Sequence, residues 1–152
     1  MNAPLRPVDV DDLDAFAPLD AAYAAAHGLE PAVTRASLAF YGRSGHSFAA
    51  GAAAAPRGFV LAHAVWDGAR PTVSIARLVA VDGEPAVLRA LAEAVVKSAY
   101  DAAVYDLTVD LPAGDEAARA AFAAPWRERP VRRFERVLGA RSESASPGAD
   151  GA

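Results

Sequence analysis

The fold is decided by residues 72–111, which read TVSIARLVAVDGEPAVLRALAEAVVKSAYDAAVYDLTVDL. A β-branched, mostly apolar run ends at Asp82-Gly83, Pro85 opens a long amphipathic segment, and a second apolar run spans residues 105–111. Runs of this kind predict a strand, a helix and a second strand. Because a crossover helix joins parallel strands of one sheet, we expect these two strands to lie parallel and the helix to pack across the sheet.

The segment after Pro85 is the most regular element of the sequence. Pro85 suits a first helical position, because its missing N–H is one that a helix leaves unpaired and its φ is already helical. Apolar residues at helical spacing predict a buried stripe of Leu88, Leu91, Ala92, Val95 and Ala99. Charged residues stand four apart on another face, at Arg89, Glu93, Lys97 and Asp101. Opposite charges one turn apart pair in solvent, so we interpret this face as a solvated surface and not as a catalytic array.

Length and composition restrict the class of protein. At 152 residues the chain has the length of one domain, which is predicted over residues 1–140, with a disordered tail over 141–152. The absence of cysteine excludes thiol chemistry and cysteine-bound zinc, and no metal site is expected. A net charge of −4 argues against a nucleic-acid partner. There is no apolar run of the roughly 18 residues that span a bilayer and no signal-peptide pattern, so we expect a cytoplasmic protein without membrane contacts.

The first third of the chain is predicted to be mostly helical. A short strand over residues 5–8 precedes a helix whose N-cap is Asp9. Pro18 is expected to break or kink this helix, because proline lacks the N–H that the helix interior needs. A further helix is expected from Ala32 to Tyr41, with Gly42 as its stop.

From Ser47 the period of the apolar pattern changes from helical to two. The later elements are predicted as strands 47–50, 58–66, 72–81 and 105–111, a short helix 116–123, and a last strand 131–138. Both faces of the strand over 58–66 are apolar, so other elements should cover both. The whole order predicts an α+β (mixed α/β) fold: a mixed, mostly antiparallel sheet with helices on both faces.

This order resembles the GNAT N-acetyltransferase superfamily, over about residues 4–139. Three phrases add to the resemblance: GHSF at 45–48, GFVLA at 58–62, and AVVKSAYD at 94–101. They look like an uncharacterised, domain-of-unknown-function branch of the superfamily. The resemblance implies transfer of an acetyl group from acetyl-CoA to an amine of a small molecule or a peptide.

The resemblance also implies where the cofactor would bind. In GNAT enzymes the loop after the fourth strand carries an Arg/Gln-x-x-Gly-x-Gly/Ala pattern, whose glycines let backbone N–H groups point at the pyrophosphate. Here that loop holds one glycine, a proline without an N–H, and the two acids Asp82 and Glu84. By resemblance, the residues that would hold the pantetheine arm are Val79, Ala80 and Val81, and those near the phosphates are Gly83, Glu84 and Ala86.

No catalytic residue is assigned from the sequence. The strand over 72–81 has no carboxylate before Asp82, and residues 121–126 lack the tyrosine that the late helix of the family carries. A substrate cleft is expected where two strands pair, lined by His63, Trp66, Ser74 and Arg77. For His63 a buried histidine satisfied within the core is the simpler interpretation.

Two further functions stay open at this point. The first is a GNAT-fold module that has lost acetyl transfer and serves in binding or protein interaction, which the short acidic loop favours. The second is a regulatory small-molecule domain of a ferredoxin-like kind, which the two N-terminal helices fit poorly. A homodimer through the apolar sheet edge or the last hairpin also stays open, while the arginines between 127 and 136 are interpreted as a solvated sheet edge. A parting of the strands over 72–81 and 105–111 that opens at Val81 would support a pantetheine site, and an unbroken ladder would oppose it.

Overall fold

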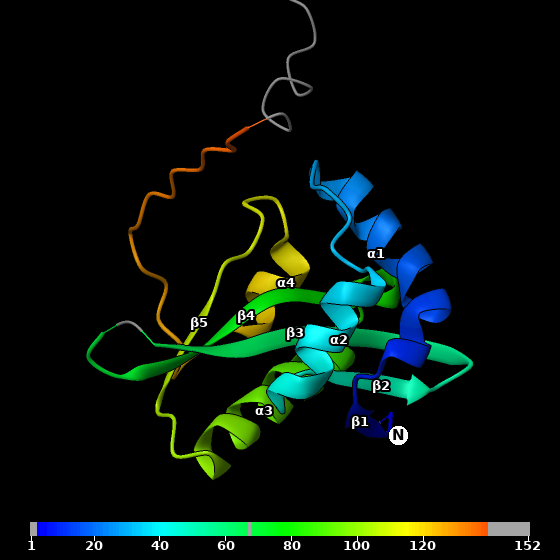
Figure 1. Cartoon of the computed structure of the whole chain (residues 1–152), viewed down its shortest axis with the longest axis horizontal. Coiled ribbons are helices and arrows are strands. Elements are labelled where there is room, and N and C mark those ends of the chain that lie inside the picture. The colour runs from blue at the N-terminus through cyan, green and yellow to red at the C-terminus, as the bar shows by residue number, and fades with distance from the viewer. Residues whose placement is uncertain (1–2, 67, 140–152) are drawn as a thin grey trace, which may run out of the picture.

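A five-stranded sheet runs through the middle of the computed structural model, which describes residues 3–66 and 68–139 (Figure 1). Its strands, in spatial as well as chain order, are β1 (Leu5–Pro7), β2 (Phe48–Ala52), β3 (Ala55–Trp66), β4 (Pro71–Ala80) and β5 (Asp106–Val109). The pairs from β1 to β4 are antiparallel, and β4 pairs with β5 in parallel. The mixed, mostly antiparallel sheet and its parallel β4–β5 unit confirm the prediction from residues 72–111.

Helices cover both faces of the sheet, as predicted (Figure 1). On one face lie η1 (Val10–Asp12), α1 (Leu13–His27) and α2 (Arg35–Ser44), and on the other lie η2 (Val81–Gly83), α3 (Pro85–Asp101) and α4 (Glu116–Ala121). Each face has its own apolar core. Phe16 and Leu38 pack with Phe59 and Leu61 on the α1–α2 side, and α3 packs on Val60 and its neighbours on the other.

Helix α3 follows the sequence prediction closely. Pro85 occupies its first turn, and the predicted stripe is buried, with Leu88, Leu91, Ala92, Val95 and Ala99 each at most 2% exposed. Lys97 and Asp101 form an ion pair of 2.6 Å on the exposed face. The apolar period of 3.6 therefore placed the helix correctly on the sheet.

Pro18 was expected to break or kink the first helix, and it does not break it. Helix α1 continues through Pro18 from Leu13 to His27. Proline removes the backbone hydrogen bond to the carbonyl four residues earlier, but it does so early in the helix, where only the first turns are affected. The buried residues Phe16, Asp20 and Ala24 lie on both sides of Pro18, so both parts of the helix pack on the sheet.

Helix α2 is shifted relative to its predicted range of 32–41. It begins at Arg35, because Thr34 and Ser37 form a capping box in which each side chain accepts the other's backbone N–H. It also passes through Gly42 and ends at Gly45, which adopts the left-handed conformation (φ 78°). Gly42 has a packing role, since a Cβ there would lie 3.0 Å from the carbonyl oxygen of Val8.

The predicted strand over 131–138 is wrong within the described residues, where this segment is neither helix nor strand. Its apolar residues Val131, Phe134 and Val137 recur every three positions and not every two, so they cannot form one face of a strand. The other differences are of length: β3 begins at Ala55 and not at Gly58, β5 covers only residues 106–109, and α4 ends at Ala121. The tail predicted over 141–152 lies outside the described residues.

Candidate functional site

Pairing between β4 and the edge strand β5 ends partway along β4. They pair from Thr72 and Asp106 to Ile75 and Val109, and β4 then continues to Ala80 without β5 beside it. Ala76 is an extra residue in β4, because Ile75 pairs with Ala62 and Arg77 with Leu61 on β3. Such a bulge bends a strand locally, and the bulged Ala76 is exposed. We call this region, residues 76–80 of β4, the strand divergence.

The three residues expected to hold a pantetheine arm lie in or next to the strand divergence. Val79 is 3% exposed and packs with Phe59 and Leu61 on the α1–α2 side. Ala80 packs against the core on the α3 side, and Val81 begins η2. Towards β3 the backbone of Val79 and Ala80 is paired, so any extended ligand would lie on the opposite edge.

The loop from β4 to α3 does not form a phosphate cradle. Asp82 and Gly83 are both left-handed (φ 53° and 63°), and a Cβ at Gly83 would lie 3.2 Å from the Cβ of Ala117 in α4. Pro85 has no N–H to offer, and Glu84 adds negative charge beside the helix N-terminus. The loop therefore does not fit the diphosphate of acetyl-CoA.

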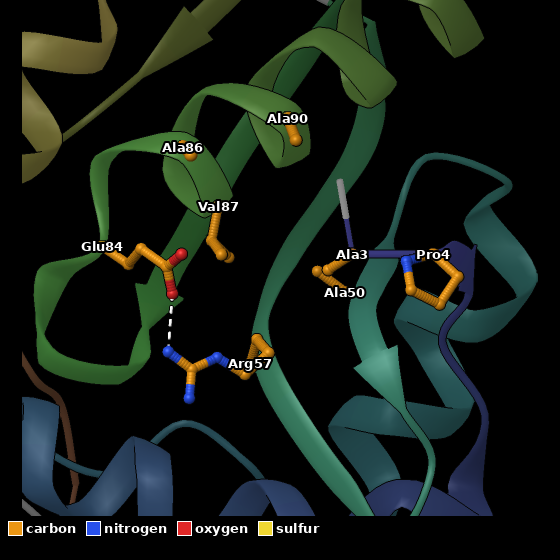
Figure 2. Close-up of a pocket in the computed structure, with 8 residues that line it drawn as sticks. All are labelled: Ala3, Pro4, Ala50, Arg57, Glu84, Ala86, Val87 and Ala90. Carbon is orange, nitrogen blue, oxygen red and sulfur yellow. Dashed lines mark hydrogen bonds and ion pairs between the residues drawn. The ribbon is translucent and has the colours of Figure 1, made fainter. Parts of the chain in front are cut away.

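Glu84 and Ala86 instead line a cavity of about 280 Å³ on the β1 side of α3 (Figure 2). Glu84 is bound across it to Arg57, with 2.6 Å between Nη2 and Oε2 (Figure 2). The remaining lining is small and apolar, formed by Ala3, Pro4, Ala50, Val87 and Ala90. A wider groove of about 550 Å³ continues beside α3 past Ala90, between β1 and the outer face of the helix. The first cavity reaches from β1 to Glu84 in the loop after β4, and the groove lies beside β1, but residues 76–80 of the strand divergence line neither of them.

A buried ion pair lies at the strand divergence on the α1–α2 side. Arg77 of β4 and Asp20 of α1 are 8% and 1% exposed, with 3.0 Å between Nε and Oδ1. Arg77 also donates through Nη2 to the carbonyl of Glu30 at 2.6 Å. The other oxygen of Asp20 accepts from the backbone N–H groups of Ala32 (2.6 Å) and Val33 (2.9 Å). The pair therefore connects α1 and the loop before α2 to residues 76–80 of β4, which have no β5 residues beside them.

Tyr23 extends this network from β4 to α4. Its ring lies 5.5 Å from the guanidinium carbon of Arg77, and its hydroxyl donates to Oδ2 of Asp115 at 2.7 Å. Oδ1 of Asp115 accepts from the N–H of Ala118 at 3.0 Å and so caps α4. Burial raises the pKa of the Tyr23 phenol well above its usual range, and the hydrogen bond to Asp115 adds to the effect. Tyr23 therefore keeps its proton at neutral pH, and its hydroxyl is a hydrogen-bond donor between β4 and α4.

Sequence reasoning missed Tyr23, which is 92 residues from Asp115 in the chain. Asp115 directly precedes the helix predicted over 116–123, and Tyr23 lies in the first third of the chain, which was predicted to be mostly helical. No spacing rule joins two such residues. Only the packing of α1 beside β4 and of α4 after β5 brings them together.

The four residues expected to line a substrate cleft do not form one cluster. His63 and Ser74 are register partners on β3 and β4. The His63 ring contacts those of Phe40 and Tyr41 on α2, with centroids 5.3 and 5.7 Å away, and its Nδ1 is buried without a protein partner. Arg77 is on the same side of the sheet but is engaged by Asp20, and Trp66 is 68% exposed at the end of β3.

Two kinds of site find no support in the described ranges, 3–66 and 68–139. His, Asp and Glu side chains do not gather in these ranges into any group of three that could hold a metal ion. Among the helices of the same ranges, none is both long and apolar enough to cross a membrane.

Comparisons with known proteins agree with this fold. A model of the family described as "Protein of unknown function (DUF1999)" matches residues 25–149. The crystal structure of TTHA1254 from Thermus thermophilus is similar at a TM-score of 0.75 and 36% identity, covering 91% of this chain and 99% of that one. A probable acetyltransferase has a TM-score of 0.69 at 16% identity, covering 90% of this chain and 98% of that one.

A ribosomal-protein-alanine N-acetyltransferase from Brucella melitensis biovar Abortus 2308 has a TM-score of 0.66 at 17% identity, covering 90% and 99% of the two chains. At such low sequence identities, the last two structures support a shared fold and nothing more. No curated protein sequence matches the chain.

Proposed function

The chain belongs to the DUF1999 family of proteins of unknown function and has the GNAT fold, and from this we propose that it is an N-acetyltransferase that uses acetyl-CoA and an amine acceptor. The observation that carries the proposal is the strand divergence, where residues 76–80 of β4 have lost β5 as a neighbour. An open strand edge can bind an extended amide chain as it would bind a further strand. The pantetheine arm is such a chain, and the residues proposed to hold it are Val79, Ala80 and Val81.

The acidic loop determines how the cofactor would be held. Its residues Gly83, Glu84 and Ala86 provide no cradle for the diphosphate, because α4 packs on Gly83 and Glu84 is negatively charged. The affinity for acetyl-CoA should then come from its pantetheine arm. A short acetyl-pantetheine thioester should bind nearly as well as the whole cofactor.

Tyr23 and Asp115 are the proposed groups for proton transfer. Formation of the amide requires that the amine lose a proton and that the leaving thiolate gain one. The Tyr23 hydroxyl is held protonated, and the Asp115 carboxylate already accepts a hydrogen bond from it at 2.7 Å. The pair lies between the strand divergence and α4, which supports its role beside an acyl group bound there.

Isothermal titration calorimetry tests this proposal. Acetyl-CoA and acetyl-pantetheine are titrated into the wild type, into Ala76→Trp, which fills the strand divergence, and into Ala53→Trp, a matched control in the exposed β2–β3 turn. We expect micromolar binding of both ligands to the wild type and to the control, and loss of both with Ala76→Trp. An amine screen with the binding-competent protein then identifies the acceptor.

Absence of binding at about 1 mM ligand, a free energy weaker than about −4 kcal/mol, would refute the acetyltransferase proposal. It would favour the second candidate, a GNAT-fold module for binding or protein interaction that has no acetyl transfer. The observation that supports this alternative is the same loop, in which Gly83 lies against Ala117 and Glu84 is paired with Arg57.

A further inference from the structure

Strand β5 has an open edge. It pairs with β4 on one side, and within residues 3–66 and 68–139 no strand pairs with its other side. An open edge presents unpaired backbone N–H and C=O groups, which a further chain segment can bind. Beside the start of β5, Tyr100 and Tyr105 are each 71% exposed, with ring centroids 6.0 Å apart. Tyrosine pairs of this kind are typical of protein interfaces.

The segment after α4 is exposed to an unusual degree. We call residues 127–139 the arm. It forms neither helix nor strand, and Figure 1 shows it in orange on the outside of the molecule, leading away from the sheet. Its large apolar side chains are exposed, with Val131 at 74%, Phe134 at 90% and Leu138 at 71%. A single chain that exposes this much apolar surface in one segment usually covers it in an assembly.

The arm and the β5 edge are complementary in charge. The arm holds five arginines against two glutamates, and β5 is bounded by Asp106 and Asp110. Within the chain, Nη1 of Arg133 in the arm lies 3.0 Å from Oδ2 of Asp110. This ion pair is exposed at both ends, and the arm does not pair with β5 as a strand. A single chain therefore has both complementary surfaces of an interface, the arm and the β5 edge, but does not pair them along their length.

We propose that the arm of one chain docks along the β5 edge of a second copy, and that the second copy's arm docks reciprocally on the first. Exchange of an identical segment between two copies is an economical route to a symmetric dimer, because every contact occurs twice. Phe134 supplies the apolar anchor against the Tyr100–Tyr105 pair, and Arg133 pairs with Asp110 between chains as it does within one.

Sedimentation equilibrium of the full-length protein between about 1 and 200 μM tests the proposal. We expect the wild type to dimerise and Phe134→Asp to raise the dissociation constant at least about tenfold. Leu29→Asp is the matched control, since Leu29 is an exposed apolar residue (40%) just after α1 and belongs to neither the arm nor β5. A wild type that stays monomeric at 200 μM, or a Phe134→Asp variant that dimerises as well as the control, would overturn the proposal.

A charge exchange separates docking between chains from docking within one chain. Arg133→Glu alone and Asp110→Arg alone each place like charges in both halves of a homodimer, so each should be monomeric. An equimolar mixture restores opposite charges at both contacts, so it should form a heterodimer. Circular dichroism melting first establishes that both variants are folded. If the folded variants fail to associate when mixed, the contact is made within one chain and the proposal is wrong.

Discussion

Replacing Asp20 by asparagine should destabilise the protein by about 3 kcal/mol, at the lower end of what is expected when one partner of a buried ion pair is removed. Asparagine keeps the size of the side chain but removes its charge. Arg77 then remains 8% exposed in the protein with its charge uncompensated. Asp20 also accepts two backbone hydrogen bonds through one oxygen, and a neutral amide oxygen would accept them more weakly.

Urea unfolding followed by circular dichroism measures this change. With a slope of about 2 kcal/mol per molar urea for a domain of this size, the midpoint should fall by about 1.5 M. Asp101→Asn is the control, because its ion pair with Lys97 is exposed and should contribute little to stability. The double variant Asp20→Leu/Arg77→Met removes both buried charges but leaves the N–H groups of Ala32 and Val33 without their acceptor, so it should recover only part of the loss. A midpoint within about 0.3 M of the wild type for Asp20→Asn would refute the reasoning that the buried pair holds α1 on β4.

Three further predictions concern the packing, the pH dependence and the candidate site. Gly58→Ala places a Cβ against the β4 backbone and should destabilise the protein by about 2–4 kcal/mol in urea unfolding. Gly114→Ala, where a Cβ has no atom within 4 Å, should leave the stability unchanged, and equal urea midpoints of the two variants would contradict the prediction. Burial lowers the pKa of His46, so below pH 6.5 the unfolded chain binds more protons than the folded protein, and the unfolding free energy should fall as the pH drops through the lowered pKa. His46→Asn should lose this pH dependence, and an unchanged slope of unfolding free energy against pH would assign it to another group. Tyr23→Phe removes the hydroxyl that donates to Asp115 and should lower acetyl transfer by about 10²–10⁴-fold while acetyl-CoA binding is unchanged; unaltered turnover would exclude Tyr23 as a proton donor.

Much of the fold could be predicted because it depends on local periodicity. The apolar stripe along α3 and the proline at its start depend only on residues close together in the chain, and the folded protein shows both as predicted. The prediction of a break at Pro18 was wrong because packing of the buried face outweighs one lost hydrogen bond. The prediction of a strand over 131–138 was wrong because its apolar residues recur every three positions, and the segment does not pair with the open edge of β5.

The candidate site shows a similar division. The loop with Asp82, Gly83 and Glu84 could be recognised from the sequence as a poor phosphate cradle, since charge and the missing N–H of proline are residue properties. The network of Arg77, Asp20 and Tyr23 could not be recognised from the sequence. Arginine, aspartate and tyrosine on amphipathic segments are usually exposed, and nothing in their spacing indicates that they will be buried against one another.

By itself the sequence determined the strand–helix–strand unit of residues 72–111, the two-sided sheet and the acidity of the loop after β4, because each is set by residues close together in the chain. Only the tertiary structure decided where β4 and β5 part, that α4 lies on Gly83, and that a phenol from α1 meets a carboxylate at the start of α4. These features depend on how elements far apart in the chain pack on one sheet. Their physical basis is the burial of both sheet faces, which brings distant polar groups together and obliges them to pair.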